Sequence, residues 1–176
     1  MTGTNGEYAM ETARHRQPSI SQFFPPNSGS PPVSSQVEDF DELYIYRTAF
    51  SRATEIFDLS KEWPSVEEKA LTDQIRRSSR SVRANIAEAW GKRRYEAHFI
   101  NKLSTAKGDG AETITWLDFA RSCEYLSPDS HEQLRKSYVQ IRADLVKMMA
   151  PPESWCGPSA LRDPNMEYET PPLDKN

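Results

Sequence analysis

Residues 65–91 read SVEEKALTDQIRRSSRSVRANIAEAWG, and this stretch decides the fold. Apolar or small side chains recur there every three or four positions, the spacing that places them on one face of an α-helix. These positions are Leu71, Ile75, Ser78, Val82, Ile86 and Ala89. Ser65, followed three residues later by Glu68, has the spacing of a capping box that starts a helix, and Gly91 suits the end of one. The stretch predicts one long amphipathic helix.

The segment before Pro64 predicts a first helix of about 25 residues, whose apolar residues recur at helical spacing. Its inner face is Leu43, Tyr46, Phe50, Ala53 and Phe57. The helix should stop near Trp63, because a proline disfavours helical geometry in the residue before it.

Two further helices follow. The third has small residues on its inner face that let a neighbouring helix approach closely. That face is Phe99, Leu103, Ala106, Gly110, Ile114 and Leu117. Ser127 and Pro128 form a cap and first-turn pair that opens the fourth. Its inner face is Leu134, Tyr138, Ile141, Leu145 and Met148.

Proline marks the limits of this helical region. Of the 13 prolines, only two lie between residues 36 and 150. Residues 1–35 are rich in small and polar residues, which predicts a flexible arm, and residues 151–176 form a Pro-rich acidic tail. Four amphipathic helices joined by short connections, with no alternating strand pattern, predict an all-α, antiparallel up-down-up-down four-helix bundle over residues 36–150, with disordered tails at both ends.

Several short motifs within the bundle resemble the 23S rRNA-intervening sequence protein family. They are Gln74-Ile75-Arg76-Arg77-Ser78, the run from Ser81 to Ala89, Ala106-Lys107-Gly108 and Ala111-Glu112-Thr113. The resemblance covers roughly residues 40 to 150 and implies an antiparallel four-helix bundle that commonly assembles into a homopentamer. One branch of the family, the accessory variability determinant of diversity-generating retroelements, works beside a reverse transcriptase and binds nucleic acid through a basic surface. Ala89 stands where the family commonly has glycine.

Basic residues gather between positions 76 and 94, where seven bases accompany a single acid, Glu88. The candidates for nucleic-acid binding are Arg76, Arg80, Arg83, Lys92, Arg93 and Arg94. The first three share one side of the helix, opposite its apolar face. They could contact phosphate, contact another subunit, or form a solvated face paired with neighbouring acids. The bundle as a whole holds 18 basic and 19 acidic residues, whereas the nucleic-acid-binding branch is strongly basic.

Polar residues beside the apolar faces predict a structural network of Asn85, Glu88 and Glu112. For Glu88 the expected partner is Arg77 or Arg121. A catalytic carboxylate pair is the less favoured alternative, because no nucleophile or metal set accompanies it. The three histidines, His15, His98 and His131, lack the spacing of a metal site, so we expect no bound metal. We also expect no cofactor. Because no nucleophile, base and oxyanion group are assembled, we expect no enzyme activity.

The amino-terminal arm contains one motif of its own. Gln17, Ile20, Phe23 and Phe24 match the peptide that binds eukaryotic and archaeal sliding clamps. A short turn would place the three apolar side chains together as a plug, with Gln17 in a polar pocket. An accidental match is the alternative.

Large apolar residues predict some self-association, because a slim bundle cannot bury all of them. They are Tyr44, Trp63, Trp90, Trp116 and Phe119. Neither a signal peptide nor a spanning segment is predicted, so we expect a cytoplasmic protein that does not enter a membrane. The leading hypothesis is a non-enzymatic, oligomeric binding or scaffolding protein. The alternatives are a nucleic-acid-binding accessory factor of a reverse transcriptase or polymerase, and a module tethered to a sliding clamp.

Overall fold

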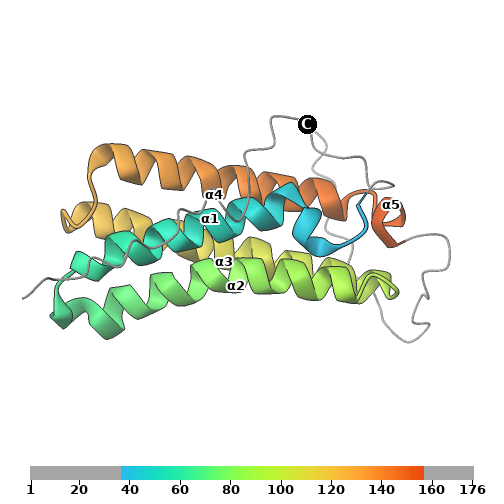
Figure 1. Cartoon of the computed structure of the whole chain (residues 1–176), viewed down its shortest axis with the longest axis horizontal. Coiled ribbons are helices and arrows are strands. Elements are labelled where there is room, and N and C mark those ends of the chain that lie inside the picture. Colours follow the sequence, from blue (N-terminus) through green and yellow to red (C-terminus); the bar gives the residue numbers. More distant parts are fainter. Residues whose placement is uncertain (1–36, 157–176) are drawn as a thin grey trace, which may run out of the picture.

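The computed structural model describes residues 37–156, and four long helices make up most of them. The helices are α1 (Tyr44–Leu59), α2 (Asp73–Gly91), α3 (Glu96–Ser122) and α4 (Pro128–Met149). They run alongside one another in alternating directions (Figure 1), and α1 and α3 each pack against both α2 and α4. This confirms the predicted bundle. The arm, its clamp motif and most of the acidic tail lie outside the described residues.

The inner faces predicted for α2, α3 and α4 are confirmed position by position. Every residue named for these three faces is buried. Tyr138 and Phe99 are the largest fully buried side chains. Gly110 also meets the expectation of close approach, because a Cβ added there would lie 3.0 Å from Cγ of Arg142 on α4. The Ser127 hydroxyl accepts from the Ser130 amide and caps α4 as predicted.

The first helix is shorter than predicted, and its inner face is rotated. It spans 16 residues, between the 3-10 turns η3 (Phe40–Glu42) and η4 (Ser60–Glu62). Its buried residues are Ile45, Tyr46, Ala49, Ala53 and Ile56. Phe50 and Phe57, predicted to point inward, are only partly buried. Small Ala49 and Ala53 occupy the centre of the face, and the two phenylalanine rings lie at its edge, toward α2.

The predicted capping box at Ser65 is wrong. Residues Ser65–Glu67 form a 3-10 turn, η5, and Glu68–Thr72 form one π-helical turn, η6, before α2 begins. No side-chain cap forms at the start of either turn. Gly91 is the last residue of α2, and Lys92, with φ −101°, takes the cap position predicted for the glycine.

A short final helix, α5 (Glu153–Cys156), follows Pro151 and Pro152 and packs on α3. Trp155 lies against the core, and Cys156 is buried. The first residues of the predicted tail are therefore part of the bundle. In the described part of the chain, none of the helices has the length and apolar character needed to cross a bilayer.

Candidate binding groove

Three arginines of α2 lie over aromatic rings of α1. The guanidinium carbons of Arg76 and Arg80 are 4.9 Å and 5.3 Å from the centroid of the Phe57 ring. Arg83 lies 3.9 Å from the centroid of Phe50 and 4.4 Å from that of Tyr46. A cation over the face of a ring is attracted by the electron density of that face. These contacts explain why the two phenylalanines are not in the core.

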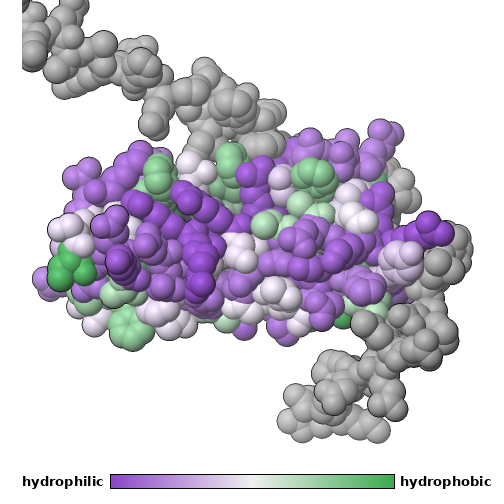
Figure 2. Space-filling view, turned by 90° about the horizontal axis from the view of Figure 1, so that it is seen from below, coloured by the Kyte–Doolittle hydropathy of each residue, from purple (hydrophilic) through white to green (hydrophobic). Residues whose placement is uncertain are grey.

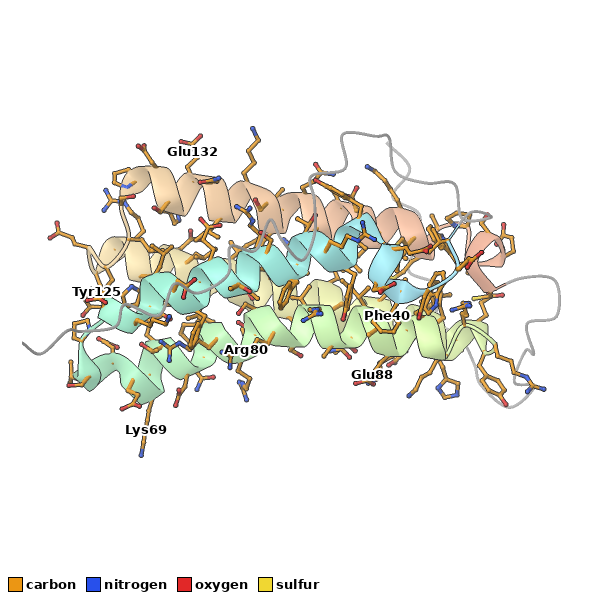
Figure 3. The ribbon with its side chains drawn as sticks, viewed as in Figure 1. Phe40, Lys69, Arg80, Glu88, Tyr125 and Glu132 are labelled. Carbon is orange, nitrogen blue, oxygen red and sulfur yellow. The ribbon has the colours of Figure 1, made fainter. Side chains whose placement is uncertain are left out.

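These rings and two of the arginines line a groove between α1 and α2. Its volume is about 470 Å³. The lining residues are Tyr46, Phe50, Ala53, Thr54, Phe57, Arg80, Arg83, Ala84 and Ala87. Arg80 lies where α2 runs beside α1 (Figure 3). Apolar walls with a few charged groups at one side are the usual make-up of a binding site.

The charges of these arginines are not neutralised by acids within residues 37–156. None of the three forms an ion pair there; Arg76 instead donates from Nε to the Ser60 hydroxyl at 2.8 Å. Nε of Arg83 is buried without a hydrogen-bond partner among the described residues. Within the described residues, these arginines therefore do not pair with neighbouring acids as one alternative expected, although Arg80 is exposed. Positive charge and aromatic surface share one groove.

The other basic candidates form a separate group at the turn between α2 and α3. Arg93 stacks on Trp90, with its guanidinium carbon 3.7 Å from the ring centroid, and donates to the Trp90 carbonyl at 3.1 Å. Lys92 and Arg94 are exposed. Lys92 follows Arg83 by nine residues, about 14 Å along a helix. The six candidates therefore do not make one compact patch.

Two of the three residues predicted for a polar network, Asn85 and Glu88, belong to one, and Asp109 is a member that the sequence did not reveal. Asp109 of α3 accepts from the Ser81 hydroxyl at 2.7 Å and from the Asn85 amide at 3.0 Å. Lys102 donates to Asn85 at 3.4 Å and pairs with Glu88 at 2.7 Å. Asp109 lies between Gly108 and Gly110. A charged residue flanked by two glycines within a helix was the sequence feature that could have pointed to its role. The network joins α2 to α3.

The partner predicted for Glu88 is wrong. Lys102, rather than Arg77 or Arg121, binds this carboxylate, and its hydrogen bond and charge lower the pKa of Glu88. Glu112 lies apart from this network: it contacts Arg77 at 3.5 Å and accepts from the indole of Trp116 at 3.2 Å. Glu88 points away from α1 (Figure 3), on the side of α2 opposite the groove.

The large apolar residues divide between core and surface. Trp90 is buried, Trp63 and Trp116 are partly buried, and Tyr44 and Phe119 are each 54% exposed. Figure 2 shows one face of the molecule, where hydrophilic side chains predominate and apolar ones form small separate groups.

The two described histidines lie in different places. His98 packs edge-on against Tyr95, with 5.8 Å between the ring centroids, whereas His131 contacts the Asp118 carboxylate at 2.7 Å. Between residues 37 and 156, no cluster of three or more His, Cys, Asp or Glu side chains could hold a metal ion.

Comparisons with known proteins agree with this architecture. A family model described as 23S rRNA-intervening sequence protein matches residues 41–147. A crystal structure from Bacteroides thetaiotaomicron, described as a protein with unknown function from the S23 ribosomal protein family, is similar over 60% of this chain and 94% of its own. The two chains share 28% sequence identity, with a TM-score of 0.55. No curated protein matches this chain.

Proposed function

We propose the following function for this chain, which belongs to the 23S rRNA-intervening sequence protein family. It is a non-enzymatic binding and scaffolding bundle. Its contact surface is the groove between α1 and α2. The observation that carries the proposal is the pairing of Arg80 and Arg83 with the α1 rings, in a groove where no described acid neutralises them. A groove lined mainly by arginines, aromatic rings and alanines is suited to holding a ligand, and we propose no chemical reaction there.

The chemistry of the groove favours an acidic protein segment that also carries apolar or aromatic side chains. Arginine binds carboxylates through its planar fork of donors, and aromatic walls accept apolar side chains. Six of the nine lining residues are aromatic rings or alanines. The bundle is also slightly acidic overall, so it lacks the long-range positive field that draws proteins to nucleic acid.

The test is binding of a fluorescent copolymer of glutamate and tyrosine, followed by anisotropy at low and physiological salt. We expect the wild type to bind and the variant Arg80→Glu/Arg83→Glu to lose about tenfold or more in affinity, because it places two acids against an acidic ligand. The matched control is Lys92→Glu/Arg94→Glu, with the same charge change at the α2–α3 turn. Equal losses in both variants would reject the groove as the site.

A second candidate function is nucleic-acid binding beside a polymerase or reverse transcriptase. It is favoured by the arginines that have no acidic partner among residues 37–156 and by exposed Lys92 and Arg94. Under this hypothesis a short RNA or DNA duplex binds in place of the copolymer, and affinity falls steeply with salt. Replacing Arg76, Arg80 and Arg83 with alanine should then abolish binding; unchanged binding would exclude these residues.

We also propose that the bundle assembles into a homopentamer, as the family resemblance implies. The support in this chain is the exposure of large apolar side chains, including Tyr44 and Phe119. Light scattering should give about five times the 20.1 kDa of one chain. A mass of one chain at micromolar concentration would contradict the assembly and leave the groove hypothesis standing.

A further inference from the structure

We infer that the acidic C-terminal segment of the same chain, residues 163–173, is a ligand of the α1–α2 groove. This inference rests on the proposed function, because it takes the groove to be a binding surface for acidic, partly apolar protein segments. The segment then competes with external partners for the groove. A partner binds only when it displaces residues 163–173.

The composition of the segment complements the groove. Residues 163–173 read DPNMEYETPPL, with Asp163, Glu167 and Glu169 as its charged residues. Glu167 and Glu169 flank Tyr168, and Met166 precedes them. Two carboxylates beside one aromatic ring match two arginines beside the α1 rings, because each arginine can bind a carboxylate while the apolar walls take the tyrosine.

The segment is long enough to reach the groove of its own bundle. Cys156, the last described residue, ends α5, which packs on α3. Arg83 is eight residues before Gly91, the last residue of α2, which is about 12 Å along the helix. Glu167 is eleven residues beyond Cys156, and eleven extended residues span up to about 36 Å. Figure 1 shows α5 at the same end of the bundle as the α2–α3 turn.

Attachment favours this occupant over the same segment of a free copy in solution. A tether of this length gives an effective concentration in the millimolar range, far above the concentration of free chains in solution. Even a weak contact would then hold the groove occupied much of the time. An external partner must exceed this internal competition, so removal of the acids from the segment should strengthen partner binding.

The test places a photo-reactive benzoylphenylalanine at Ala84, an exposed residue of the groove wall, in the full-length chain. Irradiation of a mixture of ¹⁴N- and ¹⁵N-labelled protein, followed by peptide mass spectrometry, identifies which segment is captured and from which chain. We expect cross-links to residues 163–173 carrying the same isotope as the groove. The same probe at Ala143, exposed on α4, is the control and should not capture the segment.

Charge variants sharpen the test. Glu167→Lys/Glu169→Lys should lower the cross-link yield about fivefold, and adding Arg80→Glu/Arg83→Glu should restore it, because the charges are then exchanged. Cross-links between differently labelled chains, capture of other segments only, or no effect of the charge variants would each overturn the inference. If the copolymer still binds to the groove of the same protein, the groove remains a binding surface and only the assignment of residues 163–173 as its ligand is rejected.

Discussion

Phe57 has an unusual environment for a phenylalanine that was expected in the core. Arg76, Arg80 and Lys61 all lie over its ring, at 4.9, 5.3 and 4.7 Å from the centroid. Leucine would keep most of the apolar volume and remove the ring face. We expect Phe57→Leu to lower the free energy of unfolding by about 1 kcal/mol, measured by urea denaturation.

The control for this prediction is Phe119→Leu, because Phe119 is 54% exposed and has no described arginine over its ring. That change should stay within about 0.5 kcal/mol of the wild type. If both variants lose the same stability, the arginine contacts at Phe57 contribute nothing measurable.

Two glycines of α3 offer a matched pair of substitutions. A Cβ at Gly108 would meet nothing within 4 Å, whereas a Cβ at Gly110 would lie 3.0 Å from Cγ of Arg142. Alanine favours a helix over glycine by up to about 1 kcal/mol. Gly108→Ala should therefore stabilise the bundle by about that amount in urea denaturation. Gly110→Ala should gain less, and an equal gain at both positions would show that Arg142 yields freely.

Glu88 makes a prediction about acid stability. Lys102 lowers the pKa of this carboxyl below its ordinary value of 4.5. A lowered folded-state pKa contributes stability above the ordinary pKa, and that contribution is lost as the pH falls through the folded value. The melting temperature of Glu88→Gln should therefore fall less than that of the wild type between pH 6 and pH 3. The exposed Glu132, changed to glutamine, is the control.

Sequence reasoning was reliable for residues whose role depends on helical period alone. The inner faces of α2, α3 and α4 were predicted correctly, because a stripe of apolar side chains fixes which side faces a core. It failed at Phe50 and Phe57, since period alone cannot show that an arginine from another helix will cover a ring. Asp109 was missed for the same reason: its partners Ser81 and Asn85 are on α2.

At the scale of elements, α5 was not predicted. Pro151 and Pro152 predicted only the end of the fourth helix and the start of a Pro-rich tail. The docking of α5 can be followed through its thiol. Burial raises the pKa of Cys156 to about 11, so this thiol stays protonated at neutral pH, and only the thiolate is reactive. At pH 8, iodoacetamide should modify exposed Cys123 well before Cys156, as followed by mass spectrometry.

The same experiment tests whether α5 is held by its tryptophan. Trp155 packs against the core, so Trp155→Ala should release α5 and bring the modification rate of Cys156 close to that of Cys123. A Cys156 that stays protected in the variant would show that other contacts hold the helix. Similar rates for both thiols in the wild type would contradict the described docking.

The connection between α1 and α2 shows a second limit of element prediction. Ser65 and Glu68 have the spacing of a capping box, but the chain makes a 3-10 turn and a π turn there. A capping box needs the serine just outside the first helical turn. Ser65 lies inside the 3-10 turn instead, and a sequence pattern does not distinguish these two placements.

At the scale of the whole molecule, the four-helix architecture followed from sequence because short connections and four apolar stripes leave few other arrangements. The proposed binding surface did not follow, because the groove lies between two helices whose facing residues were predicted to have different roles. Phe50 and Phe57 were assigned to the core and the arginines to an outer face. The contact between these arginines and rings forms only when the two helices pack together. The proposed function depends on it.

The most direct measurement of that account is a methyl NMR titration of the full-length chain, labelled at alanine, with the copolymer of glutamate and tyrosine. Ala53, Ala84 and Ala87 line the groove, while Ala111 on α3 and Ala143 on α4 do not. We predict that the three groove methyl signals shift and the other two stay fixed. Shifts that gather on α3 or α4 while the groove signals remain unchanged would contradict the α1–α2 groove as the binding surface.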